Sequence, residues 1–205
     1  SALELSDVLV DDSKQSKLES DARRTRAVAA SAAGRAATTE SDSEQRSKSL
    51  QVAVDDLRWL RSQNSNLDDD DDLLCEIHLT RGRNRLMRAR EPLDVEAALL
   101  GIKEIRGIFE LKPDHPSATN ELRKHADFHM GKAAESSELA GTPAVKNREE
   151  FRLLHQSVVK HASIAVEALD APDAMLHYLS ASARHSLYRD DKSLANANGA
   201  MVQFD

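Results

Sequence analysis

From Ser13 to Gln63 the sequence contains no proline and a single glycine, Gly34. The stretch consists mainly of Ala, Ser, Arg, Glu and Gln, and all of these except serine have fair to good helix propensity. So long a segment without a chain-breaking residue predicts either one long helix or two helices broken between Gly34 and Ser43. Residues 1–12 mix apolar and polar side chains and leave open a short strand, an extended arm or a first helical turn.

The first half of this stretch is lined by alanines instead of large apolar residues. Burying apolar area stabilises a fold by about 25 cal/mol per Å², so methyl side chains offset too little of the entropy lost on ordering. We therefore expect residues 13–48 to be either disordered in the free chain or helical in an assembly whose other chains supply apolar contacts. Large apolar residues return only from Leu50 to Leu60, at the spacing of one helical face.

Apolar residues recur at spacings of three and four after Pro92, which predicts an amphipathic helix opened by that proline. The members of this face are Val95, Leu99, Ile102, Ile105 and Phe109. Three further helices are expected at about 117–139, 144–169 and 170–189, the last with Asp170 as its cap and Pro172 in its first turn. Short loops between helices of this length imply antiparallel neighbours.

The predicted fold class is therefore all-α, an up-and-down helical bundle with a long N-terminal helical arm. Seven glycines, five prolines and 3% aromatic residues are too few for the many strands and turns of a β-sandwich or barrel. We expect an Ala/Ser/Arg-rich helical arm at 1–66, an acidic and Arg-rich connector at 67–91, a four-helix bundle at 92–190 and a C-terminal tail at 191–205.

The charge balance and the lack of long apolar runs argue against several classes of protein. Lys and Arg number 28 against 35 Asp and Glu, and the formal net charge of −7 does not favour nucleic acid or an anionic membrane as a partner. No apolar run approaches the roughly 20 residues needed to cross a bilayer. The first residues lack the apolar core of a signal peptide, so we expect a cytoplasmic location or one within an assembled particle, without secretion by that route.

The sequence lacks the common catalytic motifs. It contains no Gly-x-Ser-x-Gly, no Walker loop and no dinucleotide fingerprint, and its glycines are scattered singly. The one cysteine, Cys75, excludes an intramolecular disulfide and a Cys-rich zinc module. Its apolar neighbours predict a small buried side chain and not a nucleophile. We therefore expect no enzyme, no catalytic residue and no cofactor.

Five consecutive aspartates, Asp68 to Asp72, form the most conspicuous motif. The alternation of Asp68, Asp70 and Asp72 is that of the start of a calcium-binding EF-hand loop. The match ends there, because Leu73 stands where the loop needs glycine and Leu79 where it needs glutamate. We expect these aspartates to lie in a break of the chain, solvated or capping the next helix, with a metal site as the alternative.

Five arginines follow within ten positions: Arg81, Arg83, Arg85, Arg88 and Arg90. Guanidinium groups suit two-pronged contacts with carboxylate or phosphate. We favour ion pairing with the nearby aspartates or with another acidic surface, within or between subunits. The alternative is a phosphate-binding surface of a nucleic-acid-associated helical protein. No aromatic residue is interleaved, so stacking on single-stranded bases is not expected.

Glu121, His125 and His129 lie four residues apart and therefore share one helical face. Helical bundles build metal sites from inward-facing Glu and His, so a histidine-based metal-binding bundle or enzyme is an alternative hypothesis, with His155 or His161 as a further ligand. The sequence contains neither Glu-x-x-His nor His-Glu-x-x-His. We expect ordinary polar or interface histidines and no bound metal.

Taken together, these patterns predict a structural or assembly subunit of a large multi-protein complex that acts through helix-mediated contacts. The aspartate and arginine clusters would fix the register between subunits. In composition the chain resembles small helical adaptor or internal components of large particles, such as a bacteriophage virion or a secretion machine. The expected partners are further copies of the chain, other protein subunits or both, and nucleic acid is not favoured.

Overall fold

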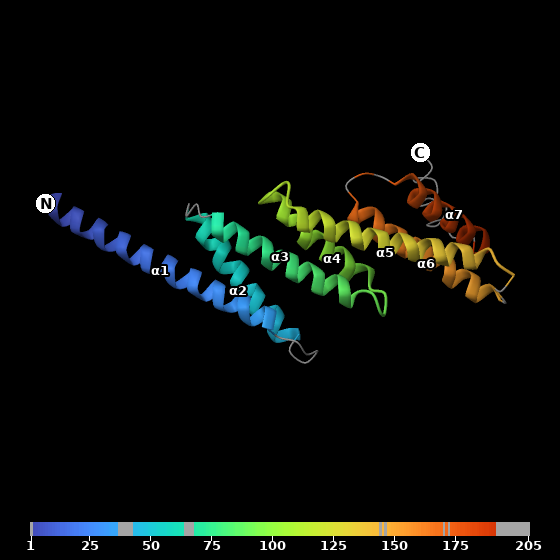
Figure 1. The fold of residues 1–205 in the computed structure, drawn as a ribbon, viewed down its shortest axis with the longest axis horizontal. Helices are drawn as coiled ribbons and strands as arrows, with labels where there is room; N and C mark the ends of the chain where they lie inside the picture. Colours follow the sequence, from blue (N-terminus) through green and yellow to red (C-terminus); the bar gives the residue numbers. More distant parts are fainter. Residues whose placement is uncertain are drawn as a thin grey trace. The chain divides into compact units, whose positions relative to one another are not determined.

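The computed structural model describes residues 2–36, 43–63, 68–143, 145, 147–169, 171 and 173–191, with the side chains at 2–14, 35–36, 43–47, 68–69 and 190–191 left out (Figure 1). Its helices are α1 (Ala2–Ala36), α2 (Ser43–Ser62), α3 (Asp68–Arg88), α4 (Val95–Arg106), α5 (Pro116–Ala140), α6 (Arg148–Ala168) and α7 (Ala174–Asp191), with a short 3-10 helix η2 (Gly107–Glu110) after α4. The described residues contain no strand, which confirms the predicted all-α class. None of these helices combines the length and the apolarity that crossing a bilayer requires.

The long proline-free stretch forms two helices, α1 and α2, as the second of the two sequence alternatives predicted. The first ends at Ala36 and the second begins at Ser43, and both ends lie inside the expected interval. Residues 2–12 belong to α1, so the strand and the extended arm considered for them are both wrong. Their helix continues directly into the alanine-rich part of the chain because no proline or glycine interrupts it.

The aspartate run begins a helix, and the prediction that it lies in a break is wrong. Asp68 to Asp72 are the first residues of α3, which continues through the arginine run to Arg88. Acidic side chains are stabilising at a helix N-terminus and basic ones at a C-terminus, because both oppose the helix dipole. The stretch 67–91, expected as a connector, is therefore occupied mainly by one helix.

The chain forms two compact units that share α3. The first unit comprises residues 1–81 with 110–113, and the second comprises 82–109 and 114–205. In the first unit, α1 packs against α2 around large side chains from α2 and α3. The buried cluster consists of Ala27, Leu50, Ala53, Val54, Leu57, Leu60, Leu74 and Ile77. The described residues of α1 contribute Ala27 to this cluster, with Ala30 packed against it, so they add only small side chains there.

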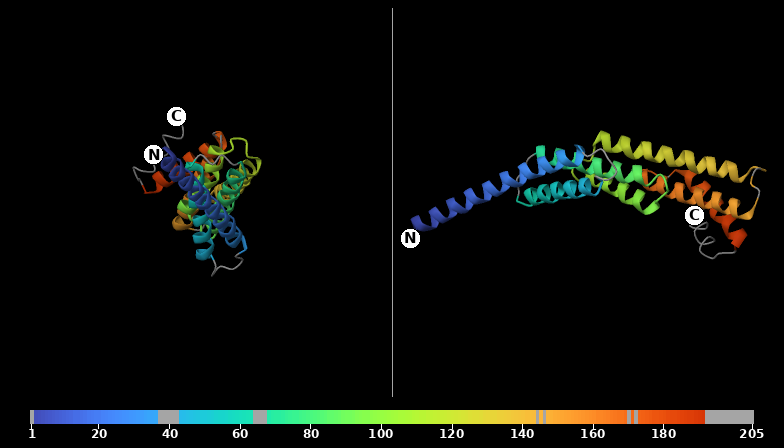
Figure 2. Two further views of the ribbon diagram at one scale, coloured as in Figure 1. Left: turned by 90° about the vertical axis from the view of Figure 1, so that its left-hand side faces the viewer. Right: turned by 90° about the horizontal axis from the view of Figure 1, so that it is seen from below.

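Helix α1 is much longer than the helix that it packs against. It has 35 residues and α2 has 20. At 1.5 Å per residue, the difference in length is about 20 Å. Within the first unit, the N-terminal half of α1 accordingly continues past α2, as two views show (Figure 1, Figure 2).

In the second unit, α5, α6 and α7 pack on one another, and α4 packs against α5 and α6. The four helices predicted within residues 92–190 are all present, with shifted starts. Pro92 lies in a turn, and the cap of α4 is Asp94, whose side chain accepts a hydrogen bond from the backbone N–H of Ala97. The cap of α7 is Asp173, at 3.0 Å from the N–H of Leu176.

Three sequence expectations at the end of the chain lie outside the described residues. They concern Asp170 as a cap, Pro172 in a first turn and the tail after residue 191.

Helices α3 and α4 cross at two glycines within the second unit. A Cβ atom added to Gly82 would lie 2.3 Å from Cγ1 of Ile105 and 3.0 Å from the carbonyl oxygen of Gly101. A Cβ atom added to Gly101 would lie 2.8 Å from Cγ of Leu86. Both distances to carbon are shorter than side chains tolerate, so the crossing depends on the missing Cβ atoms.

Candidate functional site

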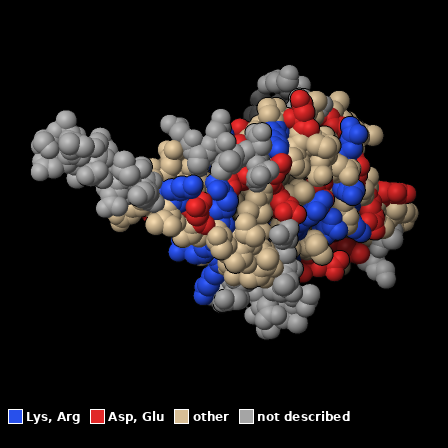
Figure 3. All heavy atoms as spheres, turned by 60° about the vertical axis from the view of Figure 1, so that its left-hand side comes forward, with Lys and Arg blue, Asp and Glu red and all other residues tan. Residues whose placement is uncertain are grey.

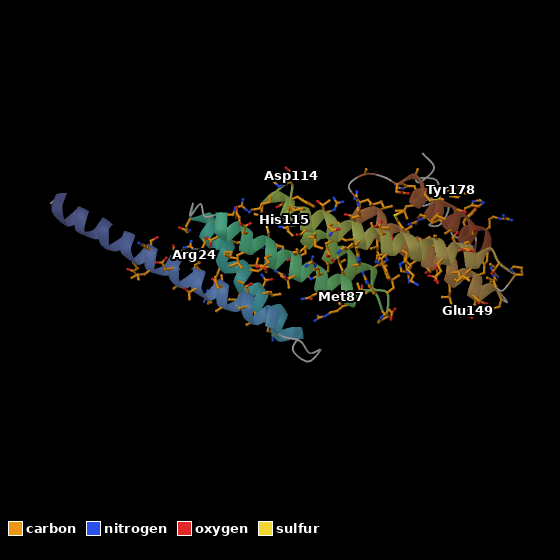
Figure 4. All side chains as sticks on the ribbon, viewed as in Figure 1. Arg24, Met87, Asp114, His115, Glu149 and Tyr178 are labelled. Atoms are coloured by element: carbon orange, nitrogen blue, oxygen red, sulfur yellow. The ribbon has the colours of Figure 1, made fainter. Side chains whose placement is uncertain are left out.

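The predicted acidic site is an anchoring point for other helices of the first unit. Asp70 is 7% exposed, and its carboxylate accepts two hydrogen bonds of 2.9 Å from the guanidinium group of Arg24. Arg24 lies on α1 and is labelled in Figure 4. Asp72 pairs with Lys112. The side chain of Asp68 lies outside the described residues. The described part of the chain holds no group of three His, Cys, Asp or Glu able to bind a metal ion.

Three of the five predicted arginines, Arg83, Arg85 and Arg90, contact groups of the second unit. Arg83 donates from Nε to Oε2 of Glu121 at 2.8 Å, and Arg85 donates from Nη1 to Oε2 of Glu104 at 3.2 Å. The guanidinium group of Arg90 lies 4.2 Å from the ring centroid of Phe128. Arg83 and Arg85 thus pair with glutamates of their own chain.

The two remaining arginines of the run lie in different environments: Arg88 is exposed and Arg81 is half-buried. On the face drawn in Figure 3, basic and acidic side chains are interspersed, and the described residues there form no continuous basic surface. The role of the aspartate and arginine clusters as contacts between subunits stays a prediction.

Sequence reasoning missed a buried ion pair of the first unit, which joins α1 to α2. The side chain of Asp56 is 2% exposed and accepts hydrogen bonds from Arg23 at 3.2 Å and from Arg26 at 2.6 and 2.5 Å. The hydrogen bond from Arg26 is the main cause that lowers the pKa of Asp56 below its ordinary value. The available signal was its position three residues after Ala53 and four before Leu60, on the apolar face of its helix.

Three histidines form a chain of ring contacts between α5 and α6. His125 and His129, both on α5, are 2% and 1% exposed, and their Nε2 atoms lie 3.2 Å apart. The other ring nitrogen of His129, Nδ1, lies 2.7 Å from Nδ1 of His161 on α6. Glu121 was expected beside the two α5 histidines, but its carboxylate binds Arg83. His155 packs its ring against Phe151 at a centroid distance of 4.3 Å.

This arrangement suits hydrogen bonding between neutral rings and does not suit one metal ion. A metal centre needs nitrogen lone pairs that converge on a point, whereas the two nitrogens of His129 face two different rings. Burial lowers the pKa of His125 to about 4, with a further contribution from the charge of Arg90. Burial, followed by the neighbouring His125 and His161, lowers the pKa of His129 to about 3. The three rings are therefore neutral near pH 7, since burial also lowers the pKa of His161.

Cys75, the residue considered as a nucleophile, is buried in the first unit. Burial raises the pKa of its thiol above the ordinary value. A reactive cysteine needs a lowered pKa and access to solvent, so the position of Cys75 fits a packing role.

No family model, curated protein or solved structure matches this chain. Its function is therefore inferred from the arrangement of its own residues. The described residues offer two arrangements that go beyond ordinary packing: the long helix α1 anchored at Asp56 and Asp70, and the histidine chain between α5 and α6.

Proposed function

We propose that this chain is a non-enzymatic subunit of a larger assembly, and that it binds its partner through the N-terminal half of α1. The observation that supports this most directly is the continuation of α1 past α2 within the first unit (Figure 1, Figure 2). A helix without neighbours is marginally stable in water, because most helical stability in proteins comes from packing of an apolar face. The projecting half of α1 gains that stability when another chain covers it.

The residues of this half fit a covered position. Leu18 on α1 is 70% exposed in the isolated chain. The segment at 2–10 is rich in apolar residues, which are Ala2, Leu3, Leu5, Val8, Leu9 and Val10. At 100° per residue these positions are spread around the helix, and a helix that is apolar on most sides is one that other elements surround. The proposed partner is therefore a set of helices from further copies of this chain or from other subunits.

The other half of α1 supports the proposal by holding the helix in place. Its guanidinium groups, those of Arg23, Arg24 and Arg26, bind carboxylates on α2 and α3. Hydrogen-bonded ion pairs of low exposure tolerate little displacement, because a shift would leave a buried carboxylate without its partner. The packed half of α1 is thus fixed in register and directs the other half outward from the helices of its unit.

Hydrogen exchange of the full chain, read together with molar mass from light scattering, tests the proposal. In a dilute monomer, residues 2–18 should exchange rapidly, because on this proposal the projecting half of α1 is covered only when a partner binds. At concentrations or with partners that raise the molar mass, the same residues should become protected. Leu18→Asp should prevent the increase in mass, because it would place a carboxylate in the covered surface.

The matched control for Leu18→Asp is Leu153→Asp on α6, which replaces a leucine that is 59% exposed. This variant should associate as the unaltered chain does. Strong protection of residues 2–18 in a dilute monomer would contradict the proposal, since the helix would then need no partner.

The two alternative functions have less support. Arg83 and Arg85, candidates for phosphate contacts, already bind carboxylates. The histidines considered as metal ligands face one another in a chain and do not converge. A nucleic-acid-associated protein would still show binding that weakens steeply with salt, and a metalloprotein would retain stoichiometric metal after purification without chelators.

A further inference from the structure

We propose that the chain of His125, His129 and His161 is an acid-sensitive latch that holds α5 to α6 while neutral and releases them when it takes up more than one proton. This inference concerns the second unit and is independent of the proposed role of α1. It rests on the two ring contacts, on the burial of the central ring and on the charges that surround them.

The two ring contacts determine how many protons the three histidines can hold while the contacts stay closed. Each of the two contacts joins two ring nitrogens at 3.2 and 2.7 Å, which are hydrogen-bond distances, so each contact has room for one proton. Three neutral imidazoles bring three protons: two occupy the contacts and the third sits on an end nitrogen, either Nδ1 of His125 or Nε2 of His161. One added proton fits on the other end nitrogen. Any further proton would place two N–H groups face to face and would force the contact open.

The surroundings do not stabilise added positive charge. Arg90, from the turn after α3, acts on His125 and His129 as a like charge. Glu121 on α5 opposes it at His125, but that carboxylate is already bound by Arg83. Phe128 packs edge to face against His129 at a centroid distance of 5.1 Å.

The surroundings of His161, the half-buried end of the histidine chain, do not stabilise added positive charge either. His161 feels Lys132 and Glu135 of α5 and Lys160 of α6. Lys132 and Glu135 pair with each other at 2.8 Å, so the carboxylate is shared with a cation. Helices α4 and α7 also pack against α5 and α6. The principal charges acting on the three rings come from α5, α6 and the turn that holds Arg90.

The direction of the response follows from linkage. Burial keeps the pKa of His125 at about 4 and that of His129 at about 3, whereas a solvated histidine has a pKa of 6.5. Between these values the open form binds more protons than the closed form, so acidification favours opening. The stabilisation that the neutral chain contributes is complete above about pH 6.5 and is lost as the pH falls toward 4.

Hydrogen exchange of the full chain between pH 7.5 and 5, corrected for intrinsic exchange rates, tests the latch. The opening equilibrium of α5 and α6 should rise at least about tenfold over this range, while α2 should change little. His129→Gln keeps a donor and an acceptor but does not titrate, so it should remove most of this dependence. The matched control is Ser136→Ala, which deletes a hydroxyl contact of 3.0 Å to Ser157 between the same helices and should leave the pH dependence unchanged.

Three results would overturn the proposal: constant protection of α5 and α6 from pH 7.5 to 5, equal pH dependence in His129→Gln and the unaltered chain, or loss of the dependence in Ser136→Ala. If His129→Gln fails to fold, a histidine ring-proton NMR titration of the unaltered chain decides. A pKa of His129 well below 6, with α5–α6 opening coupled to its protonation, supports the latch. A pKa above 6 contradicts it.

Discussion

Helices α1 and α2 are joined by charged groups, whereas α5 and α6 are joined by neutral imidazoles. Asp56 binds two arginines across the first interface, whereas His129 contacts His161 across the second and His125 on its own helix. Both central side chains are almost completely buried. Burial of a charge requires a partner of opposite charge, while burial of a titratable ring requires that it stay neutral.

The difference implies that the two interfaces respond to different conditions. The pKa of Asp56 is lowered, so its stabilisation is present above the ordinary carboxyl pKa of 3.8 and is lost only as the pH falls below that value. The histidine pKa values are lowered too, but the stabilisation that the neutral histidines contribute starts to decrease once the pH falls below about 6.5. Mild acid should therefore destabilise the second unit more than the first.

The largest expected effect is that of mild acid on the second unit. Keeping a histidine neutral at pH 5, when its open form titrates near 6.5, costs about 2 kcal/mol, so His125 and His129 together cost about 4 kcal/mol. Urea unfolding at pH 7.5 and at pH 5, monitored through the hydrogen exchange of α5 and α6, measures this loss of stability. An equal loss in both units would end the distinction between their interfaces.

A change without charge tests whether packing alone can destabilise the second unit. Gly82→Ala places a methyl group against Ile105 and the backbone of Gly101, so we expect a loss of about 3 kcal/mol that does not depend on pH. Gly131→Ala is the control, since a Cβ atom there meets nothing within 4 Å, and it should stabilise α5 by about 0.5–1 kcal/mol. Chemical denaturation of both variants distinguishes them, and a neutral Gly82→Ala would refute the close crossing.

A smaller effect is expected from removing one cation of the first unit. Arg24→Ala leaves the buried Asp70 without its two hydrogen bonds. Breaking a fully buried pair costs 3–5 kcal/mol, and because Arg24 is a third exposed we expect about 2 kcal/mol here. The double variant Arg24→Leu with Asp70→Leu should recover most of this loss, as measured by urea unfolding. A double variant as unstable as Arg24→Ala would show that the charge itself is not the cause.

The smallest effect on stability is expected from Leu18→Asp on α1. The side chain is 70% exposed, so the free energy of unfolding of the monomer should change by less than about 0.5 kcal/mol. Its effect on association should nevertheless be large if α1 is the docking element. A substantial loss of monomer stability would mean that Leu18 packs within its own chain.

The sequence predicted the helices well because their signals are local. Helical spacing located α4, proline-, glycine- and cap-containing turns located α5 to α7, and the absence of proline together with the break after Gly34 located α1 and α2. The aspartate run was misplaced because its polarity was taken for a loop signal, although the same charges stabilise a helix N-terminus.

The site was harder to predict than the fold because its partners are distant in sequence. Arg24 and Asp70 are 46 positions apart, and Arg83 and Glu121 are 38 apart. Residue spacing identified the i and i+4 pair of His125 and His129, but it gave no reason to choose His161 over His155 as the third ring. That choice depends on how α6 is rotated against α5, which the sequence pattern alone does not determine.

The row of three imidazoles between α5 and α6 also has two opposite electrical polarities. The N–H groups of the three rings can all point along the row toward His161, or they can all point toward His125. Each orientation satisfies the same two contacts. A proton that enters at one end while another leaves at the opposite end inverts the dipole of the row without moving a heavy atom. The heavy atoms of this interface therefore have one arrangement, while the dipole of the histidine row has two directions. A charge bound near either end of the row selects between these directions.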